Sequence, residues 1–255
     1  MVEISVLNGN AVGGRHERGR APALLFIHGS AGTHRSFEPL LEVLDGYERY
    51  AIDLPGRADS VGPALEHVSS MASYVAELVA SEIDGAYVVL GHSLGGAVAL
   101  EHAITRASKE LAGIVLLATG ARLRVQPIIL RLHEEAAKLG GPLPPLPPGL
   151  FEDATEPGLI AAAQSQRQGV PARTAMSDWR AANAFDRMTD LGRIEVPSLI
   201  VAGTEDTLTP PKYAEYMAAN IGKSELHMLG GAGHMLIMER AEELAVLIGR
   251  FLSRL

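Results

Sequence analysis

The sequence predicts an α/β fold with a mostly parallel central sheet, flanked by helices, and an inserted helical segment. Short apolar runs alternate with helical patterns along the chain, which is typical of a sheet covered by helices on both faces. The alternation stops between Gly120 and Val196, where only helical patterns follow one another. A structureless connection of that length is uncommon. We therefore expect a core of residues 1–120 and 191–255 and a helical cap of residues 121–190.

Six apolar runs are predicted to form the buried strands of the sheet. They are nearly continuous in hydrophobicity, as expected for parallel strands that are covered on both faces. They span residues 23–27, 50–52, 87–90, 113–118, 198–203 and 225–229. Apolar stripes at helical spacing predict core helices around residues 71–79, 94–107 and 244–251. In the cap we expect helices near residues 127–139, 159–168 and 173–184, with the proline-rich tract 140–149 as a stiff connector.

Composition and charge exclude several classes of function. The 255 residues carry a formal net charge of −8, whereas a nucleic-acid partner requires a basic surface. The chain has no cysteine, which excludes disulfides, thiol catalysis and Cys-ligated zinc. Neither a secretory leader nor a membrane-spanning apolar run is visible in the sequence. We expect a cytoplasmic protein with neither nucleic acid nor membrane as a partner.

Ser93 stands where an apolar strand meets an apolar helix, within Gly91-His92-Ser93-Leu94-Gly95. This G-x-S-x-G pattern is typical of a nucleophile elbow, a strained strand-to-helix turn that exposes its serine. In so sharp a turn, only hydrogen fits two residues before and two residues after the serine. The sequence therefore predicts Ser93 as a nucleophile and Gly91 and Gly95 as the residues that make room for it.

A nucleophilic serine needs a base, and the base needs an acid to orient it. His234 is the predicted base, because it lies in a glycine-rich loop between the strand 225–229 and the last helix. The acid is expected after the strand 198–203, where Asp206 and Glu205 are both candidates. Asp206 is favoured because it lies at the apex of that loop, although an aspartate there could also simply cap a helix.

The chain order Ser93, Asp206, His234 is that of the α/β-hydrolases. With the motifs Gly203–Pro210 and Gly231–His234, the whole chain resembles the α/β-hydrolase superfamily, in its compact, capped, esterase-like branch. This resemblance implies an α/β-hydrolase fold and catalysis by a Ser-His-Asp triad.

The resemblance also implies an oxyanion hole. The segment FIHGSAG at residues 26–32 is similar to the family's H-G-x loop. Ser30 and Leu94 would then donate their backbone N–H groups to the oxyanion. His28 and Gly29 are expected to support the loop. Residues 52–60, IDLPGRADS, resemble another family loop but carry an alanine where the family has a glycine.

We therefore expect a serine hydrolase that cleaves short to medium acyl or aryl esters through an acyl-enzyme. No metal or organic cofactor is expected; the expected partner is a small-molecule ester, and the chain is expected to be a monomer or homodimer. The same residues leave open a carbon–carbon bond hydrolase, a lactonase, a thioesterase, or a ligand-binding member without turnover. A carbon–carbon bond hydrolase would need basic cap residues to hold a carboxylate, and the cap offers Arg122, Arg124, Arg131, Arg173 and Arg180.

Overall fold

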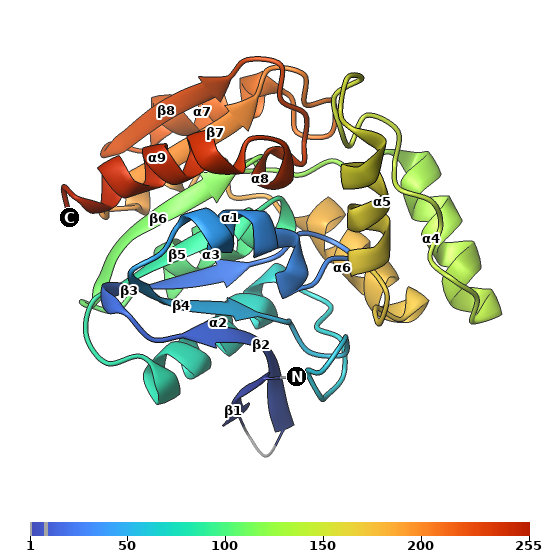
Figure 1. The fold of residues 1–255 in the computed structure, drawn as a ribbon, viewed down its shortest axis with the longest axis horizontal. Coiled ribbons are helices and arrows are strands. Elements are labelled where there is room, and N and C mark those ends of the chain that lie inside the picture. Colours follow the sequence, from blue (N-terminus) through green and yellow to red (C-terminus); the bar gives the residue numbers. More distant parts are fainter. Residues whose placement is uncertain (1, 8–9) are drawn as a thin grey trace.

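An eight-stranded sheet forms the centre of the computed structural model, which describes residues 2–7 and 10–255. The strand order is β1-β2-β4-β3-β5-β6-β7-β8, and helices cover both faces (Figure 1). The six strands from β3 to β8 run parallel, whereas β1 and β2 are antiparallel to their neighbours. The strands are β1 (Val2–Leu7), β2 (Asn10–Glu17), β3 (Arg20–Ile27), β4 (Tyr47–Ile52), β5 (Tyr87–His92), β6 (Leu111–Leu117), β7 (Ser198–Gly203) and β8 (Ser224–Leu229). The predicted mostly parallel α/β sheet is confirmed.

All six predicted strands are present, and β3 and β4 begin three residues earlier than their apolar runs. The β1–β2 hairpin was not predicted from the sequence. Strand β2 pairs antiparallel with β4, with Gly14 opposite Ile52 and Glu17 opposite Arg49. Its sequence, NAVGGRHE, is polar and rich in glycine, so it is extended because β4 offers an edge to pair with and not because of an apolar run.

The two faces of the sheet are covered by different helices. The α2 (Val68–Glu82) and α3 (Leu94–Thr105) helices pack on one face with α7 (Pro211–Asn220). The α1 (Glu38–Val43), α8 (Leu236–Glu239) and α9 (Ala241–Leu252) helices pack on the other, together with the short helix η1 (His34–Phe37). Successive residues of one strand point to opposite faces. In β3, Leu25 and Ile27 therefore join the first layer, whereas Leu24 and Phe26 join the second.

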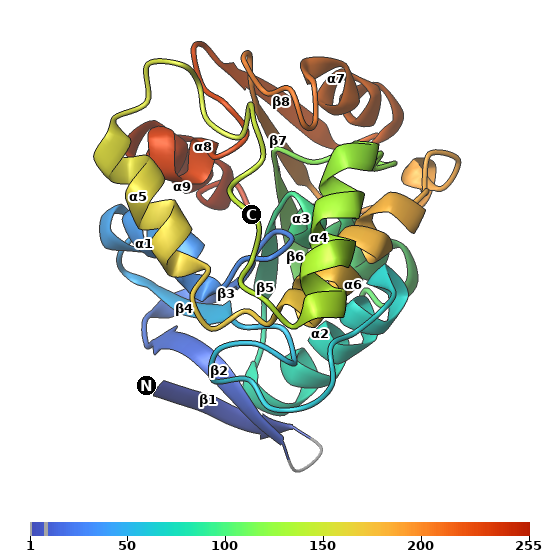
Figure 2. The ribbon, with the colours of Figure 1, turned by 90° about the vertical axis from the view of Figure 1, so that its right-hand side faces the viewer.

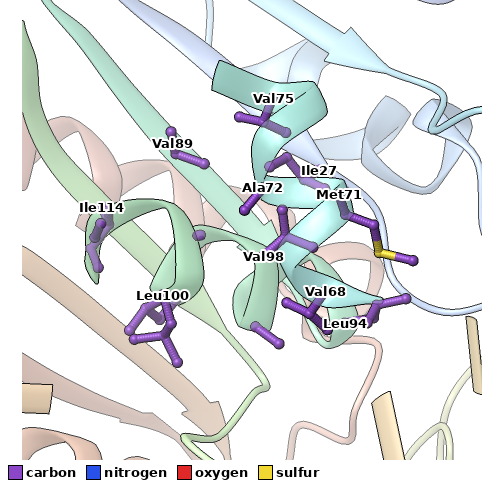
Figure 3. Packing of buried hydrophobic residues seen from close by; sticks show 14 of the residues in the cluster. Ile27, Val68, Met71, Ala72, Val75, Val89, Leu94, Val98, Leu100 and Ile114 are labelled. Atoms are coloured by element: carbon purple, nitrogen blue, oxygen red, sulfur yellow. The ribbon is translucent and has the colours of Figure 1, made fainter. Parts of the chain in front are cut away.

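The helix α3, which begins directly after Ser93, is buried along nearly its whole length. Figure 3 shows Leu94 and Val98 of α3 packed among Met71, Ala72 and Val75 of α2 and Ile27 and Val89 of the sheet. A helix that is apolar on all sides is expected at such a position, between a sheet and a second helix. This packing fixes the helix that begins directly after the predicted nucleophile.

The segment between β6 and β7 contains α4 (Pro127–Leu139), α5 (Pro157–Gln166), α6 (Ala172–Ala184) and the short helix η2 (Leu191–Arg193). Helices α4, α5 and α6 lie beyond the end of the sheet to which the parallel strands point (Figures 1 and 2). Parallel α/β sheets place their sites at that end. We propose that residues 121–190 act as a cap over it and name them the cap segment. No helix within the described residues is both long and apolar enough to cross a membrane.

Candidate active site

The backbone of Ser93 has φ +54° and ψ −116°, a strained conformation for a residue with a side chain. A Cβ at Gly91 would collide with the carbonyl group of Gly95, and a Cβ at Gly95 would collide with the carbonyl group of Ile27. Both positions therefore require glycine. The turn is held by hydrogen bonds from Ser93 N to Leu117 O (2.9 Å) and from Thr119 Oγ1 to Ser93 O (2.7 Å).

Three predicted residues meet at the carboxyl ends of β5, β7 and β8. Ser93 Oγ lies 2.9 Å from His234 Nε2, and His234 Nδ1 lies 2.8 Å from Asp206 Oδ2. All three residues are buried. An ionised Asp206 holds the proton of a neutral His234 on Nδ1. The Nε2 atom is then free to accept the hydroxyl proton of Ser93.

Asp206 is held as an ionised acceptor. Its Oδ1 accepts the N–H groups of Leu208 and Thr209, both at 2.8 Å, and its Oδ2 accepts the Thr209 hydroxyl at 2.7 Å. Burial alone would raise the pKa of Asp206, but His234 and these hydrogen bonds outweigh burial and lower it. The alternative acid, Glu205, is exposed and bonds Thr204 instead. The structure thus brings Asp206, and not Glu205, beside His234.

Two further histidines support the site as neutral donors. His92 Nε2 lies 2.9 Å from the carbonyl oxygen of His234, to which it donates. Burial, reinforced by His234, lowers the pKa of His92 to about 3. His28 Nδ1 donates to Gly29 O (2.8 Å), and His28 Nε2 accepts the N–H of Leu54 (3.2 Å). Burial, with Arg57 nearby, lowers the pKa of His28 to about 4.

Of the two predicted oxyanion donors, Ser30 lines the same two pockets as Ser93, and Leu94 directly follows Ser93 in the chain. Leu94 is the first residue of α3, so its N–H has no acceptor within the helix. No acceptor in the described part of the chain is found for the N–H of either residue. A Cβ at Gly29 would lie 3.0 Å from His92 Nδ1 and 3.2 Å from Ser93 Cβ, so glycine lets the loop come close to the elbow.

A buried ion pair that the sequence did not predict holds residues 28–32, which we name the oxyanion loop after their predicted role, against the cap segment. Asp178 of α6 binds Arg57 through two hydrogen bonds of 2.6 and 2.7 Å, and both side chains are almost fully buried. The same carboxylate accepts the N–H of Ala31 at 2.8 Å. Ala31 directly follows Ser30 and has φ +54°. Asp178 therefore fixes the backbone next to one predicted oxyanion donor.

The loop that departs from the family pattern keeps its shape without the second glycine. Ala58 has φ +45°, which costs an alanine on the order of 1 kcal/mol. Its N–H donates to Gly169 O of the cap segment at 2.9 Å. Asp53, at the start of the loop, accepts the N–H of His34 at 2.7 Å and pairs with its Nδ1 at 2.9 Å. The loop is thus anchored at both ends.

Two pockets open beside Ser93, and both are also lined by Ser30, Trp179 and His234. We name the first the α5 pocket. We name the second the α4 pocket. The α5 pocket is further lined by Leu146, Pro147, Leu150, Ala163, Gln166, Arg167 and Met235, and the α4 pocket by Leu123, Arg124, Val125, Gln126, Ile129, Ala182 and Leu208.

Comparison with known proteins identifies the family of the chain. The model of the alpha/beta hydrolase family matches residues 24–247. The chain belongs to the α/β-hydrolase family. This α/β hydrolase is 31% identical to a thermophilic esterase of known structure, with a TM-score of 0.80 and coverage of 97% of this chain and 95% of that one. Its fold is also that of an esterase from Exiguobacterium antarcticum, at 19% identity, with a TM-score of 0.85 and 98% of each chain covered.

Among curated relatives, the α/β hydrolase is 28% identical to the pimeloyl-[acyl-carrier protein] methyl ester esterase of Neisseria meningitidis serogroup C, over 89% of this chain and 92% of the relative. It is 27% identical to part of the polyketide synthase ThaQ of Burkholderia thailandensis, over 92% of this chain. The chain spans only 12% of the length of that synthase. The relatives support a hydrolase-type enzyme.

Proposed function

We propose that this α/β hydrolase cleaves carboxylic esters with Ser93 as nucleophile, His234 as general base and Asp206 as the acid that orients it. The observation that carries the proposal is the continuous hydrogen-bonded line from Asp206 through His234 to Ser93, with distances of 2.8 and 2.9 Å. The lowered pKa of Asp206 keeps its carboxylate charged, which stabilises the imidazolium that forms during the reaction.

In the acylation half-reaction, His234 Nε2 takes the proton of the Ser93 hydroxyl as Ser93 Oγ attacks the ester carbonyl. The carbonyl oxygen becomes an oxyanion, which accepts hydrogen bonds from the N–H groups of Ser30 and Leu94. The bond between the carbonyl carbon and the alcohol oxygen then breaks, and His234 returns its proton to the leaving alkoxide. The products are the free alcohol and an ester on Ser93.

Water completes the cycle by the same groups. His234 removes a proton from a water molecule, whose oxygen attacks the acyl-enzyme carbonyl. The oxyanion again lies against Ser30 and Leu94, and the protonated His234 gives its proton to Ser93 Oγ as the acyl group leaves. The net reaction converts one ester and one water into one acid and one alcohol, with no metal or organic cofactor required.

The walls of the two pockets favour short to medium acyl or aryl esters. Each pocket combines apolar side chains with a few polar groups, as small-molecule sites do. Of the compared proteins that are more than 25% identical to this chain, two are named as esterases, and one of these is named as a methyl ester esterase. Lactones, thioesters and carbon–carbon bonds next to a carbonyl would be attacked by the same serine, so a panel of these substrates compared by kcat/KM is the measurement that separates them.

Replacement of the nucleophile tests the proposal. We expect Ser93→Ala to lower kcat for p-nitrophenyl butyrate by about 10³-fold or more, because the step that forms the acyl-enzyme is lost. The control is Ser81→Ala, which removes an exposed hydroxyl at the end of α2. Hydrolysis by Ser93→Ala at a rate close to that of Ser81→Ala would overturn the proposed function.

A further inference from the structure

The wall of the α5 pocket contains a buried cation that has no counter-ion among the described residues. Arg167 directly follows α5, lines this pocket together with Ser93, and is only 8% exposed. Its Nη1 donates to Pro144 O (3.0 Å) and to Gln164 Oε1 (3.3 Å), both neutral acceptors. Burial is the one influence on its pKa, which is lowered without any contribution from a carboxylate. Arg167 nevertheless stays charged at neutral pH.

The other arginines around the site are paired with carboxylates. Arg57 binds Asp178, and Arg124, at the α4 pocket, lies 3.8 Å from Asp186. Arg122 lies 3.4 Å from the same aspartate. An unpaired buried charge is costly. An arginine that lines a pocket without a paired anion is therefore well suited to bind an anionic group of a ligand.

The rest of the pocket wall is also short of partners. Ser30 Oγ and Trp179 Nε1 are buried with no hydrogen-bond partner among the described residues. Both residues line the α5 pocket with Arg167. Among the described residues, Arg167 makes side-chain hydrogen bonds only through Nη1. Its Nε and Nη2 form one edge of the guanidinium group and have no protein acceptor there. Such an edge matches the two oxygens of a carboxylate.

We propose that the α5 pocket binds a carboxylate group of the substrate through Arg167, so that the preferred ester carries a free carboxylate besides the bond that is cleaved. This inference rests on the proposed function for the cleavage step, and it names the substrate class as carboxylate-bearing esters. The neutral contacts of Arg167 with Pro144 and Gln164 give it a structural role as well, so the test must separate charge recognition from support of the fold.

The kinetic test compares esters that differ only in charge. Monomethyl glutarate and methyl glutaramate carry a carboxylate or a carboxamide on the acyl side, and acetoxyacetate and acetoxyacetamide carry them on the alcohol side. For one of these pairs we expect the wild-type protein to prefer the carboxylate in kcat/KM by about tenfold or more, since charged hydrogen bonds discriminate at that level. The pair that shows the preference identifies which half of the ester lies in the α5 pocket.

Variants of Arg167 then test whether this residue causes the preference for the carboxylate. In Arg167→Met the ratio of carboxylate to carboxamide should fall to about one, whereas Arg167→Lys, which keeps the charge and loses the planar fork, should keep part of it. The matched control is Arg173→Met, because Arg173 is an exposed arginine of the same cap segment. Because each variant is scored by a ratio of two substrates, a general loss of activity cancels. If Arg167→Met does not fold, Arg167→Lys decides.

A binding measurement makes the outcome independent of catalysis. Trp179 is the single tryptophan of the chain and lines the α5 pocket, so its fluorescence reports on occupancy. We expect glutarate to change this fluorescence saturably in the wild type and at least about tenfold more weakly in Arg167→Met, with glutaramide inert. No preference in either pair together with no glutarate response, or a preference that Arg167→Met retains, overturns the inference. If no ester is cleaved but glutarate binds through Arg167, the proposed function fails and the carboxylate site stands.

Discussion

Ser93 lines the two pockets on a turn that is possible because two neighbouring residues have no side chain. The carbonyl groups of Gly95 and Ile27 occupy the positions where the Cβ atoms of Gly91 and Gly95 would lie. With glycine at both positions, the strand, the turn and the helix lie closer together than any side chain there would allow. The strained backbone at Ser93 costs on the order of 1–3 kcal/mol. The buried packing of α3 offsets this cost.

We expect Gly95→Ala to destabilise the protein by about 3 kcal/mol, because the new methyl group meets backbone and not a flexible side chain. Urea denaturation measures the change. The control is Gly249→Ala in α9, where an added Cβ meets no atom within 4 Å, and which should stabilise the helix by about 1 kcal/mol. Equal stability of Gly95→Ala and the wild type would contradict the role of this glycine.

At the residue scale, the sequence was sufficient where a site residue stands in a local motif. Ser93, Asp206 and His234 each follow a predicted strand, so their neighbours in the chain placed them at one end of the sheet. Their catalytic roles remain predictions. Asp178 and Arg167 lie on the cap segment without a motif, and Asp178 meets Arg57 across 121 positions of sequence. Such pairs follow from how the segment packs, which no local pattern encodes.

At the scale of elements, α6 joins the cap segment to the loops around the nucleophile. Asp178 bonds the oxyanion loop and Arg57, and on the same helix the hydroxyl of Thr174 donates to Gly56 O at 2.8 Å. A shift of α6 would therefore move the backbone beside Ser30. The β1–β2 hairpin shows the opposite case, because its pairing with β4 decides its structure and its sequence gives little sign of it.

Asp178→Asn should cost about 3–5 kcal/mol of stability, because it leaves Arg57 buried without its counter-ion. It should also lower kcat for p-nitrophenyl butyrate, since the acceptor for Ala31 N–H is weakened. The double variant Arg57→Met with Asp178→Leu should recover most of the stability but not the rate. Thermal unfolding and steady-state kinetics measure the two effects, and recovery of both together would show that Asp178 does not position the oxyanion loop.

At the scale of the whole molecule, buried histidines make the fold sensitive to acid. Burial lowers the pKa of His28 and of His102 to about 4 and that of His92 to about 3. In the unfolded chain these groups have ordinary values near 6.5. Below that pH the unfolded state takes up protons that the folded state refuses, so stability is lost as the pH falls from about 6.5 to about 4.

The expected slope is up to about 1.4 kcal/mol per pH unit for each of the three histidines. Urea denaturation at several pH values between 7 and 5 measures it. His102→Gln, which removes a histidine that bonds Tyr87, should reduce the slope by up to about 1.4 kcal/mol per pH unit. His67→Gln, at an exposed position, is the control. A free energy of unfolding that is equal at pH 7 and pH 5 would contradict this account.

The two ends of the cap segment meet, because Arg187 N donates to Ala121 O at 2.7 Å. The cap segment is therefore an insertion that leaves the core and returns to it at nearly the same point. A segment inserted in this way can be exchanged for another without changing the register of the sheet. A different inserted segment would thus change the pocket walls and leave the three residues at the strand ends in place.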